Sequence, residues 1–224
     1  FFLERDSTAV NISDKALKSV AFIGVREDGR FQPRATAFFV QWAEEQHRFD
    51  HLVTAEHVVS GLLSKNQEIW LRVNLVGGGA GEVKLDPQAF CFHPKNEEMP
   101  TDVAVCPMSH ALTGEKDGEP AEADIAFLDL SNGGYLPSEA FKKDYMGRGG
   151  DISIIGLFRS HYGKNRNVPI VRVGTIAALP EEPVWTKYAG YIEAYLIEAR
   201  SIAGLSGSPV FAHPDLAMEL SKSL

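Results

Sequence analysis

The segment Gly204-Leu205-Ser206-Gly207-Ser208-Pro209 places one serine between two glycines, just before the apolar residues Val210 and Phe211. Glycine reaches backbone conformations with positive φ at little cost, so this segment can form a tight turn with the serine hydroxyl outward. Such a turn also brings backbone N–H groups close to a bound atom. An acyl-transfer nucleophile needs both an exposed hydroxyl and donors aimed at the developing oxyanion. The segment alone is a weak signal, so the interpretation depends on residues further upstream.

Composition limits the classes of protein to consider. The chain has 224 residues, which is enough for one large or two small domains with real cores. Its net charge of −8 argues against nucleic acid or an anionic membrane as the main partner. No apolar run approaches the roughly 20 residues that span a bilayer. Only Cys91 and Cys106 are present, so nothing demands an oxidising compartment. We expect a cytoplasmic protein, but periplasmic or secreted locations stay open because the sequence begins with Phe1 rather than Met.

Short strand-like runs with turn residues between them predict an all-β fold. Residues 19–25 and 35–42 are rich in Val, Ile and Phe and flank a polar turn at 26–30, which predicts a hairpin. Residues 55–64 have the apolar spacing of a short helix, whereas the polar stretch 109–123 is typical of an exposed loop. Further strands are expected at 69–76, 152–158, 169–178 and 191–199. At more than 200 residues, two packed barrels are favoured over one. We therefore predict two packed six-stranded antiparallel β-barrels with a few short helices, divided into residues 1–146 and 147–224.

His57 stands where a predicted strand gives way to a predicted helix, in Thr54-Ala55-Glu56-His57. The small Ala55 allows a tight bend at this junction. An imidazole at such a strand end can serve as a general base. A histidine in this position also commonly caps or packs, so the motif alone leaves both interpretations open.

Asp102 is the candidate for the acid that would orient this histidine, in Thr101-Asp102-Val103-Ala104. A carboxylate that leads into a buried strand is costly to bury without a partner, which is usually a backbone N–H or a histidine. Asp124 precedes Ile125 and Ala126 in the same local pattern. We favour Asp102 for its spacing from His57 and for the loop-like segment at residues 93–94 that precedes it.

The three segments occur in the order histidine, aspartate, serine, with the serine late in the chain. In this order they resemble the signature segments of trypsin-like serine peptidases, which have the chymotrypsin fold. The α/β-hydrolases use another order and need a G-x-S-x-G motif, which Ser208 breaks here. Residues 34–40, 152–158 and 171–176 are similar to further strands of disulfide-free bacterial members, HtrA-type relatives included. The resemblance covers roughly residues 19–211.

The resemblance implies a role for each site residue. Ser206 would be the nucleophile, His57 the general base and acid, and Asp102 the orienting carboxylate, while the backbone N–H groups of Gly204 and Ser206 would form the oxyanion hole. The side chain that precedes the scissile bond would enter a pocket lined by four consecutive residues, which are Arg200, Ser201, Ile202 and Ala203.

The sequence also departs from the family pattern. Leu205 stands where activated digestive members have an aspartate that binds a newly cut N-terminus, so activation by that route is not expected. No segment after Phe211 matches the strand with which the family binds the substrate backbone. Either that strand lies outside these 224 residues, or this site lacks it.

These observations predict a serine endopeptidase that acts on protein or peptide substrates without a cofactor or metal. His47, His51 and His57 lie close in sequence, but their spacing does not match a metal site. The alternative is a binding or sensor module on a protease fold, with little or no constitutive activity. The sequence leaves the cleavage preference, the activation mechanism and the oligomeric state open.

Overall fold

The computed structural model describes residues 12–93, 101–131, 147–200 and 203–213. The described α-helices and 3₁₀-helices are few and short: α1 (Asp14–Lys18), α2 (Glu56–Leu63), η1 (Pro87–Ala89) and η3 (Arg159–His161). The described strands of the first half are β1 (Val20–Glu27), β2 (Arg30–Glu44), β3 (His47–Thr54), β4 (Ile69–Asn74), β5 (Ala80–Leu85), β6 (Cys91–Phe92), β7 (Ala104–Pro107), β8 (Thr113–Lys116), β9 (Glu119–Glu122) and β10 (Leu128–Asp129). Those of the second half are β11 (Asp151–Gly156), β12 (Ile170–Ala178), β13 (Val184–Thr186), β14 (Gly190–Ile192), β15 (Leu196–Ala199) and β16 (Val210–Ala212). The prediction of an all-β chain with a few short helices is confirmed.

The first sheet contains ten of the described strands, in the order β6-β7-β3-β2-β1-β4-β5-β8-β9, with β10 added to β2. All the pairs are antiparallel except that of β10 with β2. The hairpin predicted near residues 19–42 is present as β1 and β2, which turn through Asp28 and Gly29 at positive φ. An Asp-Gly pair with both residues at positive φ matches the right-handed twist of the flanking strands.

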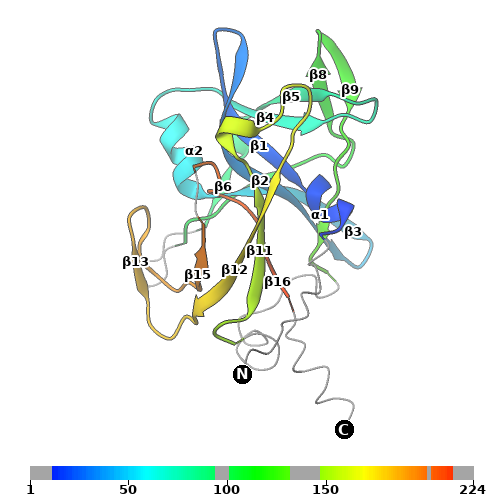
Figure 1. The fold of residues 1–224 in the computed structure, drawn as a ribbon. Helices are drawn as coiled ribbons and strands as arrows, with labels where there is room; N and C mark the ends of the chain where they lie inside the picture. Colours follow the sequence, from blue (N-terminus) through cyan, green and yellow to red (C-terminus); the bar gives the residue numbers. More distant parts are fainter. Residues whose placement is uncertain (1–11, 94–100, 132–146, 201–202, 214–224) are drawn as a thin grey trace.

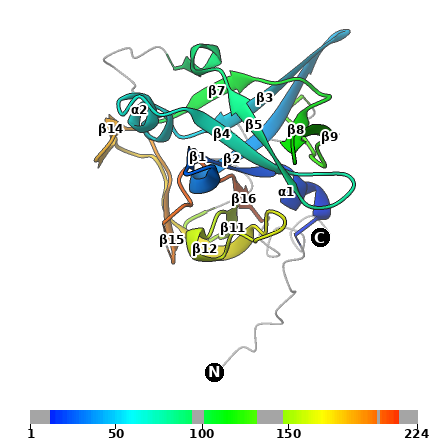
Figure 2. The same cartoon turned by 90° about the horizontal axis from the view of Figure 1, so that it is seen from above.

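The second half forms a four-stranded sheet in the order β15-β12-β11-β16, and β13 pairs with β14 as a separate hairpin. Figure 1 shows these strands below the first sheet, with the β13–β14 hairpin on the same side of the molecule as α2. Seen from above, β14 lies next to the end of α2 (Figure 2). The predicted boundary between residues 146 and 147 is not tested by this arrangement and stays a prediction.

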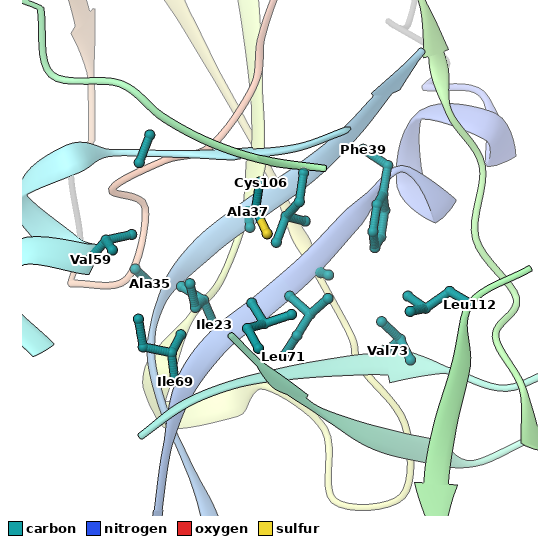
Figure 3. Packing of buried hydrophobic residues seen from close by; sticks show 14 of the residues in the cluster. Ile23, Ala35, Ala37, Phe39, Val59, Ile69, Leu71, Val73, Cys106 and Leu112 are labelled. Carbon is teal, nitrogen blue, oxygen red and sulfur yellow. The ribbon is translucent and has the colours of Figure 1, made fainter. Parts of the chain in front are cut away.

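The main core lies inside the first sheet, where alternate residues of its strands meet. Phe39, Leu71 and Ile23 are fully buried there, and Val59 reaches the same cluster from α2 (Figure 3). A second cluster, which includes Phe22, Trp70, Ile155 and Leu157, joins strands of both halves. Burial of apolar surface from both sheets therefore fixes one half against the other.

Some local predictions were wrong. Residues 109–123 are not a loop throughout, because β8 and β9 form a hairpin there around Asp117 and Gly118, both at positive φ. Trp185, in the β13–β14 hairpin, is 65% exposed. The predicted strand at 191–199 is divided between β14 and β15.

In the part of the chain that the structure describes, no helix has the length and apolar character needed to cross a membrane.

Candidate active site

Ser206 is exposed in a tight turn that is held against strand β2. Its two flanking glycines take positive φ, +110° for Gly204 and +78° for Gly207, and the Ser208 N–H donates to the Leu205 carbonyl at 2.9 Å. Residues with a Cβ rarely adopt this backbone region. The glycines noted in the sequence are therefore required by the shape of the turn.

Thr36 of β2 connects this turn to the first half of the molecule. Its backbone N–H donates to the Ser206 carbonyl at 2.9 Å, and its hydroxyl donates to the Gly204 carbonyl at 2.8 Å. The same hydroxyl accepts from the Leu157 N–H at 2.8 Å, just beyond β11. Thr36 is fully buried, so each of these polar groups must find a partner. One threonine thus fixes the serine turn to strands of both sheets.

Gly207 lies so close to the first sheet that a side chain would not fit. A Cβ built on Gly207 would lie 2.3 Å from the Thr36 carbonyl oxygen and 2.4 Å from the Thr54 hydroxyl oxygen. Thr54 ends β3 and donates its hydroxyl to the Thr36 carbonyl at 2.7 Å. The turn is therefore packed onto the end of the strand that leads to His57.

His57 lies in the first turn of α2, directly after β3. The helix begins after Ala55, whose backbone is extended and whose side chain makes no capping hydrogen bond. Val59, two residues after His57, is completely buried in the main core. Because successive residues of an α-helix are about 100° apart, burial of Val59 turns His57 to the other side. There its Nε2 lies 3.3 Å from Ser206 Oγ.

Asp102 lies in the segment before β7 and holds both the ring and the backbone of His57. Its Oδ2 is 2.6 Å from His57 Nδ1, and its Oδ1 accepts from the His57 backbone N–H at 2.8 Å. An ionised carboxylate only accepts hydrogen bonds, so Nδ1 carries the proton and Nε2 is left to accept one from Ser206. The carboxylate also supplies the N-terminal cap that Ala55 does not give to α2.

The electrostatics of Asp102 favour its ionised form. Partial burial by itself raises the pKa of this carboxyl group. Hydrogen bonds from the His57 ring and from the backbone N–H groups of His57 and Glu56 act in the other direction and are stronger together. The net effect is a pKa below the ordinary value for aspartate, so a fixed negative charge stands behind the imidazole.

Asp124, the alternative acid, is engaged elsewhere. Its carboxylate pairs with Lys18 at the end of α1, with a distance of 2.8 Å between Lys18 Nζ and Asp124 Oδ1. Its backbone N–H donates to the carbonyl of Asn74 in β4. The same local sequence pattern therefore gives two different environments, and only that of Asp102 includes His57.

The expected oxyanion donors are placed in the serine turn. No acceptor in the described part of the chain takes a hydrogen bond from the amide N–H of Gly204 or Ser206. Of the four residues expected to line the substrate pocket, Arg200 and Ala203 are exposed, and Ser201 and Ile202 lie outside the described residues. In the same described part, no group of three or more histidine, cysteine or acidic residues is arranged to hold a metal ion.

Tyr188 is a site residue that the sequence did not predict. It stands in the loop of the β13–β14 hairpin and stacks on the His57 imidazole, with ring centroids 4.1 Å apart and planes 9° apart. Asp102, Glu56 and Tyr188 line a hollow of about 430 Å³ on this side of the histidine. The sequence contains only a partial signal for an aromatic residue near the site. Three aromatic residues, Trp185, Tyr188 and Tyr191, occur within a short stretch. Nothing local connects that stretch with residue 57.

The arrangement as a whole can transfer a proton from a hydroxyl to an imidazole backed by a carboxylate. Such a relay raises the nucleophilicity of a serine that is otherwise weak at neutral pH. The relay spans both halves of the chain, since His57 and Asp102 belong to the first half and Ser206 to the second.

No protein-family model matches the sequence, and no curated protein matches it either. Among solved structures, the chain is similar to the crystal structure of Deg5, with 20% identity and a TM-score of 0.48 over 88% of this chain and 76% of that chain. It is also similar to the MamO protease domain from Magnetospirillum magneticum in its apo form, with 15% identity and a TM-score of 0.48 over 89% of this chain and 80% of that chain.

Proposed function

We propose that the chain is a serine endopeptidase of the trypsin-like type, which hydrolyses peptide bonds through an acyl-enzyme on Ser206. The proposal rests on one observation above all. A continuous series of contacts runs from the Asp102 carboxylate through both ring nitrogens of His57 to the Ser206 hydroxyl. No cofactor is needed for this chemistry.

In the proposed reaction, Ser206 Oγ attacks the carbonyl carbon of the substrate while His57 Nε2 takes the hydroxyl proton. The N–H groups of Gly204 and Ser206 donate to the oxyanion that forms. Nε2 then gives the proton to the leaving amine, and the acyl group stays on Ser206 until water hydrolyses it. Asp102 keeps its charge throughout and stabilises the imidazolium between the two proton transfers.

A fluorophosphonate probe, which reacts covalently with activated serines, tests the proposal. Wild-type protein is expected to be labelled on Ser206 and to cleave a denatured protein such as casein. Ser206→Ala should abolish both, with Ser208→Ala as the matched control two residues away. If well-folded wild-type protein takes up no label between pH 7 and 9, the proposed enzymatic activity is refuted.

The second candidate is a protease-fold binding or sensor module with little constitutive activity. Two observations favour it, namely the Tyr188 ring stacked on His57 and the long distance of 3.3 Å between Nε2 and Ser206 Oγ. Catalytic hydrogen bonds are often long before substrate binds, so the second observation also fits an enzyme. A sensor module should bind peptides without cleaving them and should take up no fluorophosphonate label, whereas a peptidase should cleave casein and be labelled. A cytoplasmic location and protein or peptide substrates remain predictions within either candidate.

A further inference from the structure

A groove of about 770 Å³ has Ser206 and His57 in its lining, and Tyr188 is not among its lining residues. Its walls come from the β1–β2 hairpin, from α2 with the turn that follows it, and from the segment after β11. The charged residues among its lining are Glu27, Arg34, Lys65 and Arg159. Positive side chains therefore predominate here, although the protein as a whole carries a net charge of −8.

Two of these cations have no ion-pair partner in the part of the chain that the structure describes. Glu27, the one carboxylate of the lining, forms an ion pair with Arg34. Among the described residues, no carboxylate pairs with Lys65 or Arg159, and both side chains are exposed. By contrast, the hollow on the Tyr188 side is lined by Glu56 and Asp102 and by no cation. The two hollows that border His57 thus differ in the charge of their linings.

The aliphatic stem of Arg159 packs against the serine turn, although the residue as a whole is exposed. A Cβ built on Gly204 would lie 3.1 Å from Arg159 Cγ, so the stem of the arginine packs against this glycine. Leu157, two residues earlier, is completely buried and bonded to Thr36. Lys65 is placed by the end of α2, where its backbone N–H donates to the Leu62 carbonyl. Both charges are therefore brought to the groove by ordered backbone.

We propose that this groove recognises acidic side chains in the part of the substrate that follows the scissile bond, with Lys65 and Arg159 as specificity-determining residues. The proposal rests on the proposed peptidase function, since it assigns a substrate class to the same site. We assign the groove to the leaving-group side because its lining includes His57, which in the proposed reaction gives its proton to the leaving amine, and includes neither Arg200 nor Ala203.

Cleavage of an unbiased peptide mixture, read by mass spectrometry, tests the preference directly. Solvent-exposed ion pairs stabilise modestly, so each cation should favour Asp or Glu over Asn or Gln by about 3-fold, and both together by about 10-fold. The preference should fall toward 1-fold in 1 M NaCl, where the screening length is about 3 Å. Lys65→Ala with Arg159→Ala should remove it. Lys164→Ala with Arg166→Ala is the matched control, because neither residue lines the groove.

A second measurement does not depend on turnover. Fluorescein-labelled peptides that differ only in Glu against Gln are titrated into Ser206→Ala protein with and without the Lys65→Ala and Arg159→Ala changes. Tighter binding of the Glu peptide, lost in the double variant, supports the groove even if no probe labels Ser206, in which case the proposed function alone fails. If wild-type protein is labelled but shows no acidic preference, or shows it only before the scissile bond, the groove assignment is overturned and the peptidase stands.

Discussion

Replacement of Gly207 by alanine tests whether the serine turn is wedged onto the first sheet. The added Cβ would stand 2.3 Å from the Thr36 carbonyl oxygen and 2.4 Å from the Thr54 hydroxyl, both of which are held by hydrogen bonds. Gly29→Ala is the matched control. Gly29 has a similar φ of +70°, but a Cβ added there would meet nothing within 4 Å.

Both variants lose stability through backbone strain, but only Gly207→Ala also introduces a steric overlap. Alanine at a positive φ costs about 1–2 kcal/mol at either position. At position 207 the protein must also either accept the overpacking, which costs about 1–3 kcal/mol, or move the turn. A displaced turn would give up the hydrogen bonds from Thr36, each of which contributes about 1 kcal/mol. We therefore expect Gly207→Ala to lower the free energy of unfolding by about 2–5 kcal/mol, against about 1–2 kcal/mol for Gly29→Ala.

Urea denaturation gives the free energies of unfolding, and the rate of fluorophosphonate labelling reports the turn. Gly207→Ala should label much more slowly than wild type even where the protein is fully folded, whereas Gly29→Ala should label normally. Equal destabilisation of the two variants would refute the reasoning. So would wild-type labelling of folded Gly207→Ala protein, because the turn would then tolerate the displacement.

Three further changes probe other parts of the structure. Asp102→Asn should lower kcat/KM about 10⁴-fold by changing the imidazole tautomer. Because folding lowers the pKa of Asp102, its carboxylate stabilises the protein above about pH 4, and this stabilisation is lost as the pH falls through the folded-state pKa. The free energies of unfolding of wild type and variant in urea should therefore converge in acid, and a difference that stays constant with pH would contradict the pKa shift. Tyr188→Ala should lower kcat/KM about 2- to 10-fold, the value of one aromatic stack, whereas Tyr188→Phe, which keeps a ring, should stay close to wild type. Higher activity in Tyr188→Ala would instead identify the ring as a cover over His57. Phe39→Ala should lower the free energy of unfolding, measured by urea denaturation, by about 3–5 kcal/mol. A decrease below about 1 kcal/mol would mean that the main core repacks around the smaller side chain.

The local elements could be predicted where the signal itself is local. The β1–β2 hairpin was predicted from two apolar runs around Asp28-Gly29, and α2 from the spacing of its apolar residues. The β8–β9 hairpin was missed because its polar composition outweighed the Asp117-Gly118 turn, which is the same signal as in β1–β2.

The same contrast between local and distant signals decides which site residues could be predicted. The residues at positions 57, 102 and 206 were singled out from short motifs and their order, and the structure brings all three side chains together. Tyr188 and Thr36 could not be found because their partners are 131 and 168 residues away in the sequence, positions 57 and 204. Asn167 lies in a polar segment before β12, and nothing in its local sequence indicates that it is buried. It is buried because Arg72 of β4, itself buried, donates to its side chain and to the carbonyls of the same segment.

The contacts of Thr36 also bear on when the site can form during synthesis. Residues of β2 leave the ribosome well before the serine turn, and the turn takes its shape from hydrogen bonds that only folded β2 can offer. A nascent chain that has made His57 and Asp102 still lacks the proposed nucleophile, and a fragment with Ser206 alone has no template for its turn. If the proposed function holds, hydrolysis at this serine begins only after the two halves have docked, and an unfinished chain cannot cleave itself or its neighbours.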